Sequence, residues 1–337
     1  MLTKEHSPET ARVMMTGTTD AHSISDIREF AHRIISKPSD TEEIRDTVLR
    51  LCNIQESLPN MKLRRQIIGQ CFIPSKPNIY LELTQTTEDH MSSIETIALV
   101  VAKDVSLVSK IMQLANSSYY GYARKVSDLS DAIKILGLET IQGIALSFGT
   151  FSQFQDKISL QKIQTITDQS VQVAKMAVAV ARKLPLSDHL RQLAFVAGLL
   201  HACGKLVLMQ IGDEHEYETI CEAAEQCSMP EWEAEEFTWG MSHAEVGAYI
   251  LDLWGLPLSL VESVLFHHAP AKSSHPDENA ACLVHIAEAL VKLRLTKNHE
   301  QFTAEVDATL IDRLGWKKHI ETLKLAVLEN TNEVTNR

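Results

Sequence analysis

The sequence has few of the features that mark special classes of protein. Of its 337 residues, 13 are glycine and 10 proline, which excludes collagen-like and low-complexity chains. Its 6 cysteines include no C-x-x-C pair, so we expect no zinc ribbon and no thioredoxin-like site. Uncharged stretches stay well short of the ~20 apolar residues that a membrane helix needs, and no apolar signal segment follows the first residues. We therefore expect a soluble cytoplasmic protein.

Basic residues are also few: 32 Lys and Arg stand against 44 Asp and Glu, a formal net charge of −12. Because nucleic-acid affinity comes mainly from Lys and Arg, this balance argues against a DNA-binding protein. The acidic excess is concentrated in residues 213–236, which include no Lys or Arg. Such a run is typical of the solvated face of a helix pair, and we expect that here. The alternative is a negative surface beside a nearby pocket.

The first 60 residues have the pattern of a small α/β fragment. Apolar runs at 11–15 and 33–35 predict two strands, and residues 22–30 between them have helical spacing. Asp40, with Glu43 three residues later, predicts the start of a second helix. The order strand, helix, strand, helix is typical of a parallel α/β arrangement. We therefore expect residues 1–60 to form a domain fragment of their own.

From residue 61 to residue 337 the apolar spacing is helical almost throughout. Examples are residues 94–114, residues 132–136 before Gly137, and residues 167–183. Gly137 is a good terminator for the helix before it. We therefore expect a protein that is mainly α-helical, with an all-α domain over 61–337 whose core spans about 70–290.

The N-terminal fragment resembles the second half of a response-regulator receiver domain. The resemblance implies that Thr16 and Lys37, the latter followed by Pro38, would flank an aspartyl phosphate. The acidic pair and phosphoacceptor aspartate of that family lie upstream of the strand at 11–15, so we expect no phosphorylation of this fragment as written. The first strand would also keep one unpaired edge. Either the true start lies upstream, or the fragment packs against the helical domain or another chain.

A longer series of motifs follows in fixed order between residues 70 and 290. The most specific stretches are Leu114-Ala115-Asn116-Ser117-Ser118-Tyr119-Tyr120-Gly121 and Gly198-Leu199-Leu200-His201-Ala202-Cys203-Gly204-Lys205. The others are Ile73-Pro74-Ser75-Lys76-Pro77, Val126-Ser127, Leu136-Gly137-Leu138, Trp254-Gly255-Leu256-Pro257 and His267-His268. Together they resemble the HDOD domain, an all-α signalling module related to HD-type phosphohydrolases, whose C-terminal helical subdomain is HD-like.

An HD phosphohydrolase holds metal with His and Asp ligands, and the metal activates a water that attacks phosphorus. The resemblance places the corresponding positions at Gln169, His201, Ala202, His243, His267 or His268, and Glu288. Alanine cannot ligate a metal, and glutamine is a poor substitute for imidazole. We therefore expect a degenerate pocket with no catalytic residue, no metal and no cofactor. The alternative is a residual metal site of His201, His243, His267 and Glu288.

Two further regions bear on partners. The loop containing Asn116, Tyr119 and Tyr120 is either an interaction surface or a turn whose tyrosines pack locally. Residues 127–148 have the spacing of a helix-turn-helix, but their second helix contains no Lys or Arg, so we do not expect DNA binding.

The resemblances together imply a non-enzymatic output or regulatory module of a bacterial two-component-type pathway. It would act by binding a protein partner or a small ligand through its degenerate HD fold. The alternative is a weak metal-dependent phosphohydrolase with a rebuilt pocket. The sequence identifies neither the partner nor the oligomeric state.

Overall fold

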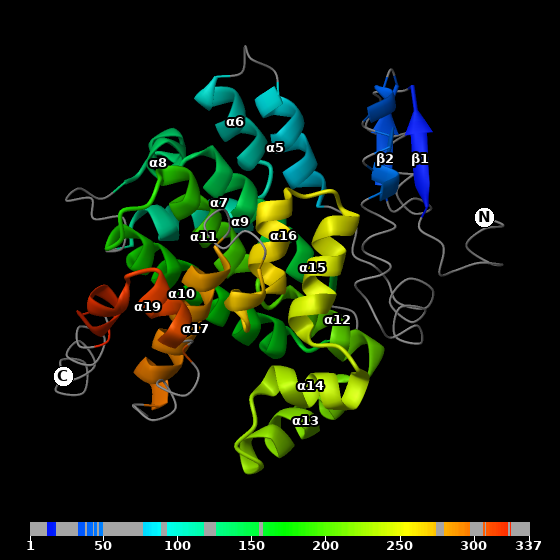
Figure 1. Ribbon diagram of the computed structural model, residues 1–337. Helices are drawn as coiled ribbons and strands as arrows, with labels where there is room; N and C mark the ends of the chain where they lie inside the picture. Colours follow the sequence, from blue (N-terminus) through cyan, green and yellow to red (C-terminus); the bar gives the residue numbers. More distant parts are fainter. Residues whose placement is uncertain are drawn as a thin grey trace. The chain divides into compact units, whose positions relative to one another are not determined.

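The computed structural model is mainly α-helical (Figure 1). It describes residues 12–17, 33–37, 39–49 except 43 and 46, 77–88, 93–117, 126–154, 158–273, 280–296, and 306–324 except 307 and 323. These residues fall into two compact units, each built from separate segments of the chain. The first unit contains the described residues up to 49 together with 153–163 and 202–261, and the second contains those within 76–152, 164–201 and 262–337. The predicted domain boundary at residue 60 lies outside the described residues.

The predicted α/β pattern at the N-terminus is present as two parallel strands. Strand β1 (Val13–Thr16) pairs with β2 (Arg33–Ser36), with Thr16 opposite Ser36. The predicted helix between them lies outside the described residues. Asp40 begins the next helix as predicted, because its side chain accepts a hydrogen bond of 2.6 Å from the backbone N–H of Glu42.

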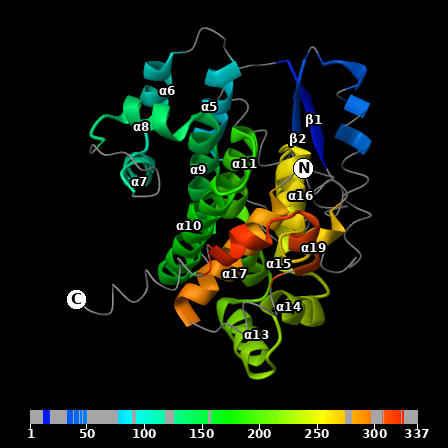
Figure 2. The same cartoon turned by 60° about the vertical axis from the view of Figure 1, so that its left-hand side comes forward.

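The second unit contains nine of the described helices, and those from α5 to α11 contribute residues to one apolar core. They are α5 (Asn78–Glu88), α6 (Ile94–Val101), α7 (Val105–Ala115), α8 (Leu129–Leu136), α9 (Leu138–Phe151), α11 (Asp188–Leu200), α17 (Ala281–Thr296), α19 (Ala308–Arg313) and most of α10 (Leu160–Arg182). The core includes Leu83, Ile111, Ile144, Phe195 and Leu199. Helices α9 and α11 lie side by side within it (Figure 2).

Local signals explain where these helices begin and end. Asp104 caps the start of α7 by accepting a hydrogen bond of 3.0 Å from the N–H of Leu107. Gly137 ends α8 with φ +81°, a backbone conformation that side chains with a Cβ rarely adopt. Helix α9 begins directly after it and is buried along much of its length. Helix α9, the second helix of the helix-turn-helix spacing, is therefore part of the core of this unit.

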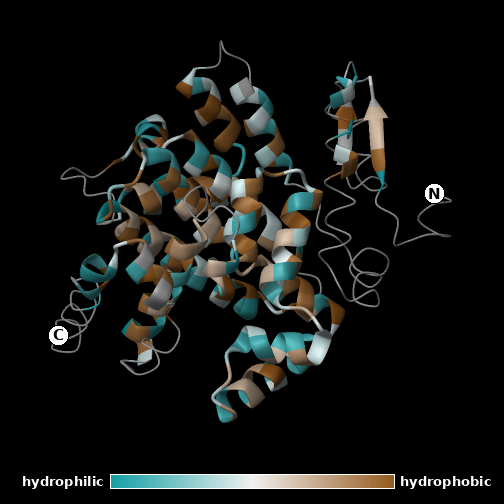
Figure 3. Cartoon of the chain, in the orientation of Figure 1, coloured by the Kyte–Doolittle hydropathy of each residue, from teal (hydrophilic) through white to brown (hydrophobic). Residues whose placement is uncertain are grey.

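The first unit contains helices α12 (Cys203–Ile211), α13 (Glu214–Gln226), α14 (Glu231–Trp239) and α15 (His243–Leu253). Helix α12 packs closely against α15 because residue 204 is glycine. A Cβ at that position would lie 2.0 Å from the carbonyl oxygen of His243. Helices α13 and α14 form a hairpin around Ile220, Ala224 and Ala234. Hydrophilic residues cover much of this hairpin (Figure 3).

One stretch of the described chain is long and apolar enough to cross a membrane by length and composition. It is Asp188–Ile211, which contains α11 and α12, and 83% of its apolar window is buried inside the protein. Such burial is typical of a helix in the core of a globular protein, which passes the same test.

Candidate functional site

The motif Gly198–Lys205 runs from the end of α11 into α12 and contains His201. His201 ends α11, and its ring Nδ1 lies 2.8 Å from the carbonyl oxygen of Gly198. A Cβ at position 198 would lie 2.6 Å from the Cα of Ala174, so glycine lets α11 approach α10 closely. His201 itself is buried, with a relative exposure of 4%.

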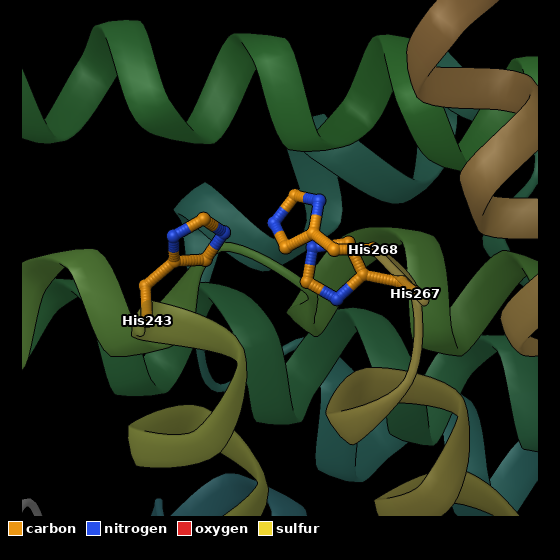
Figure 4. Close-up of side chains that lie close together, drawn as sticks. All are labelled: His243, His267 and His268. Atoms are coloured by element: carbon orange, nitrogen blue, oxygen red, sulfur yellow. The ribbon is translucent and has the colours of Figure 1, made fainter. Parts of the chain in front are cut away.

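A group of histidines and one glutamate meets in the second unit, which we call the histidine cluster: His201, His267, His268, His285 and Glu288. His267 and His268 follow the end of α16 (Leu258–Leu265), and their ring centroids are 3.8 Å apart. Figure 4 shows these two rings next to each other. The rings of His201 and His267 meet edge to face at 5.3 Å. Glu288 reaches the cluster from α17, with Oε2 3.7 Å from Nδ1 of His268.

Backbone carbonyls fix the orientation of three of these rings. Nδ1 of His267 lies 2.6 Å from the carbonyl oxygen of Val264, and Nδ1 of His285 lies 2.8 Å from the carbonyl oxygen of His267. His201 makes the same kind of contact with Gly198. Because a carbonyl only accepts, Nδ1 must carry the proton, and in a neutral ring the lone pair is then on Nε2. This tautomer is the one a histidine needs to offer Nε2 to a ligand.

Glu288 is held in its charged form. Burial alone would raise its pKa, but the nearby Lys292, His268, His267 and His201 outweigh burial and lower the pKa of Glu288 well below its ordinary value. Lys292 Nζ is 3.5 Å from Glu288 Oε1, and His267 Nε2 is 4.0 Å from Oε2. The histidine cluster therefore contains one carboxylate surrounded by groups that can carry positive charge.

A second polar network lies in the first unit, which we call the His243 network: Lys205, Tyr217, Glu231, Glu235 and His243. His243 begins α15, as labelled in Figure 4. Oε2 of Glu235 accepts hydrogen bonds from the backbone N–H of His243 at 2.6 Å and from its ring Nδ1 at 2.7 Å. Both side chains are almost fully buried, with relative exposures of 1% for His243 and 0% for Glu235.

Tyr217 joins the two carboxylates of this network. Its hydroxyl oxygen lies 2.5 Å from Glu235 Oε1 and 2.6 Å from Glu231 Oε1, so one hydroxyl proton serves two carboxylate oxygens. Burial raises the pKa of Tyr217 well above its ordinary value, and the two negative charges raise it further. Lys205 Nζ donates to Glu231 Oε2 at 2.7 Å. Burial would raise the pKa of Glu231, but Lys205 and His243 lower it below its ordinary range.

The predicted pocket positions divide among three environments. The structure brings His201, His267, His268 and Glu288 together in the histidine cluster. His243 belongs to the His243 network of the first unit. Gln169 is exposed on α10, and Ala202 is buried at the start of α12, where its methyl group offers no ligand atom. The assignment of all these positions to one degenerate pocket stays a prediction.

The receiver-like residues lie at one end of the strand pair. Thr16 is the last residue of β1, and Lys37 follows directly after β2 and is exposed. Pro38 lies outside the described residues. The two positions are therefore near in register, as a receiver-like arrangement requires, but the receiver resemblance itself stays a hypothesis.

In the predicted interaction loop, Asn116 has a structural contact. Its side-chain amide donates to the carbonyl oxygens of Met112 and Val126, and its Oδ1 accepts from the N–H of Val126 at 2.7 Å. Asn116 thus ties the end of α7 to the chain ten residues later. Tyr119 and Tyr120 lie outside the described residues, so both predictions for the loop stay open.

Sequence reasoning did not name Lys205, Tyr217 or His285 as site residues, and it misjudged Glu231 and Glu235. We expected the acidic run 213–236 to be a solvated face, and this is wrong for these two side chains, which are bound into the His243 network. The sequence did contain a signal. The two glutamates are four residues apart on α14 and therefore share a helix face, and both must find partners where that face is buried.

Comparison with known proteins identifies the family. The HDOD domain model matches residues 73–270, more than half of the chain. A crystal structure of an HDOD domain protein of unknown function from Geobacter sulfurreducens superposes with a TM-score of 0.54 at 20% identity, covering 84% of this chain and 98% of that one. A protein from Shewanella amazonensis, provisionally named a phosphohydrolase, superposes with a TM-score of 0.60 at 20% identity, covering 81% and 95%.

Two further relatives extend the comparison. A protein from Marinobacter aquaeolei, provisionally named a signal transduction protein, superposes with a TM-score of 0.51 at 18% identity, covering 93% of this chain and 72% of that one. An uncharacterized protein from Treponema pallidum is 26% identical over 217 residues, or 64% of this chain. The match covers 42% of the length of the Treponema protein. These likenesses agree with the all-α fold, and the family model establishes that the chain belongs to the HDOD family.

Proposed function

We propose that this chain is a non-enzymatic signalling module that binds a protein partner or a small ligand at its histidine cluster. Its context would be a bacterial pathway of the two-component type, and its location the cytoplasm. Relatives of the same fold include proteins named for signal transduction and for phosphohydrolysis, so the choice between binding and catalysis rests on the residues of this chain.

The observation that carries the proposal is the buried Ala202 beside His201. In an HD phosphohydrolase the residue after this histidine is the defining carboxylate ligand, and a methyl group cannot replace it. Gln169, at the position of the leading histidine, is exposed. Two ligand positions of the hydrolase pattern are thus lost, whereas the buried rings and the charged Glu288 remain as groups that can recognise a partner.

Metal content and turnover test this proposal. We expect purified protein to contain no stoichiometric iron, manganese or zinc and to hydrolyse neither a chromogenic phosphodiester nor a cyclic dinucleotide. Ala202→Asp restores the carboxylate, and we expect this variant, but not Ala202→Asn, to gain manganese affinity. Wild-type protein that carries metal and turns over substrate, with both lost in His201→Ala, would overturn the proposal.

A second candidate, a weak metal-dependent phosphohydrolase, is favoured by one observation. His267, His268 and Glu288 gather side chains that suit iron, manganese or zinc, and the Nδ1 contact of His267 directs its lone pair to Nε2. A metal held there would supply Lewis acidity, and Lys292 would balance the charge of Glu288. The same measurements separate the two candidates, because only this one predicts metal-dependent turnover by the wild-type chain.

A further inference from the structure

The solvent side of α14 combines two carboxylates with one exposed aromatic ring. Phe237 is 89% exposed, the highest value among the large apolar side chains that the structure describes. Glu233 lies four residues before it and Glu236 directly precedes it, and both are exposed. Residues spaced three and four apart on a helix are neighbours on its surface, so these three side chains share one side of α14. We call them the α14 face.

Helix α14 places its apolar and charged residues in the reverse of the usual way. In a helix on the surface of a globular protein, apolar side chains face the core and charged side chains face the solvent. Here Glu235 is 0% exposed and bound to His243, whereas the ring of Phe237 faces the solvent. A local rule that is broken on a well-packed element is expected at a functional site. The reversal therefore directs attention to the exposed ring.

The buried side of α14 is held at both ends, so Phe237 cannot turn inward. Near the start of the helix, Glu231 Oε2 accepts a hydrogen bond of 2.7 Å from Lys205 Nζ. At the end of the helix, the ring of Trp239 stacks on the ring of Tyr217, with centroids 5.8 Å apart. Rotation of α14 to bury Phe237 would break these contacts. The hairpin of α13 and α14 thus presents the ring on a fixed platform.

We propose that the α14 face is a docking surface for a basic segment of a partner protein. An apolar side chain of this segment packs on Phe237, and its Lys or Arg side chains pair with Glu233 and Glu236. Aromatic residues are enriched at the centres of protein interfaces. The face lies in the first unit and shares no residue with the histidine cluster, so it goes beyond the function proposed above.

Charge decides which occupant fits. Residues 213–236, which include most of the hairpin, contain ten Asp and Glu and no Lys or Arg, and hydrophilic residues cover much of it (Figure 3). This charge repels an anionic membrane and nucleic acid, and it opposes pairing with a second copy, which would bring two acidic faces together. A basic protein segment is the occupant whose charge is complementary.

Fluorescence anisotropy of labelled synthetic peptides, titrated with the full chain at low ionic strength, tests the surface. One peptide repeats Leu-Lys-Lys-Leu-Leu-Lys-Leu twice, and the other carries glutamate in place of each lysine. We expect the lysine peptide to bind, with an affinity that falls as salt rises, and the glutamate peptide not to bind. Phe237→Ser should weaken binding of the lysine peptide by about 10-fold and Glu233→Gln by about 3-fold.

The matched control is Leu99→Ser, which removes an apolar side chain that is 70% exposed on α6. It should change the affinity for the lysine peptide by less than about 2-fold. Because Phe237 is exposed, Phe237→Ser should leave the urea midpoint of unfolding unchanged, so that its loss of binding does not reflect loss of structure.

Four results would overturn the proposal. The lysine peptide does not bind, the glutamate peptide binds equally well, or Leu99→Ser weakens binding as much as Phe237→Ser does. The fourth is a large fall in the urea midpoint of Phe237→Ser, which would show that the ring packs within the chain. Light scattering adds one more check, because a wild-type dimer that Phe237→Ser converts to a monomer would assign the α14 face to a second copy and overturn the basic partner.

Discussion

The histidine cluster of the second unit and the His243 network of the first unit contact their carboxylates in different ways. Each holds buried imidazole beside a carboxylate. In the His243 network, Glu235 accepts two hydrogen bonds from His243, at 2.6 and 2.7 Å, and has no exposed surface. In the histidine cluster, Glu288 stands 3.5 to 4.0 Å from Lys292, His268 and His267, and its side chain is 15% exposed.

This difference distinguishes a structural arrangement from a site whose contacts a ligand or partner can replace. Short, buried hydrogen bonds from His243 and Tyr217 occupy both carboxylate oxygens of Glu235, and breaking them leaves unsatisfied groups in the interior. The longer contacts of Glu288 are ion pairs that a ligand or partner could replace. We infer that the His243 network stabilises the fold, and that the histidine cluster is the more adaptable of the two.

The largest effect is expected where the packing that holds His243 is broken. Gly204→Ala would place a Cβ 2.0 Å from the His243 carbonyl oxygen, so α12 and α15 must separate. We expect a loss of more than about 4 kcal/mol in the free energy of unfolding, measured by urea titration. Gly17→Ala, at a position with nothing within 4 Å, is the control and should stay within about 0.5 kcal/mol. Equal stabilities of the two variants would contradict the close packing.

The next effect comes from neutralising the buried carboxylate. Glu235→Gln leaves the shape but weakens the contacts with the His243 ring, the His243 amide and Tyr217. The expected loss is about 3 kcal/mol, from the same unfolding measurement. Glu233→Gln, on the exposed face of the same helix, should cost less than about 0.5 kcal/mol.

A smaller effect is expected from Glu288→Gln, which makes the same chemical change in the other region. Because its partners are farther away and the side chain is partly exposed, we expect a loss of about 1 kcal/mol. If Glu288→Gln lowers the free energy of unfolding as much as Glu235→Gln does, the distinction between a structural network and an adaptable cluster is wrong.

The smallest expected effect is a change in how stability against unfolding depends on pH. The pKa of Glu231 is lower in the folded protein than its ordinary value, because Lys205 and His243 outweigh burial. Its charge therefore stabilises the fold above a pH of about 4.3, the unfolded value, and this contribution is lost as the pH falls toward the folded pKa. Unfolding measured from pH 6 to pH 3 should show a shallower decline for Glu231→Gln than for wild type. Parallel curves would exclude a role for Glu231.

Much of the fold was accessible from local patterns. The apolar runs predicted β1 and β2, Gly137 predicted the end of α8, and Asp40 predicted a helix start, and the structure confirms each. These signals involve residues that are neighbours in the chain, where backbone preferences decide the outcome.

The site was less accessible, because it depends on contacts between distant residues. The resemblance pointed to His201, His267, His268 and Glu288, which do meet, but it also included Gln169, which is exposed. The amino-acid composition did not indicate the other buried contacts. The acidic run 213–236 suggested that Glu235 is a surface residue, whereas it is buried against His243. Only packing between helices reveals such partners.

The bond from the His243 amide to Glu235 also provides a built-in spectroscopic reporter. A backbone N–H that donates to a buried carboxylate at 2.6 Å should resonate far downfield in a proton spectrum and exchange slowly with deuterium. This one signal would follow the integrity of the first unit in intact protein while ligands are added to the second. It would separate local rearrangement from global unfolding without any engineered label.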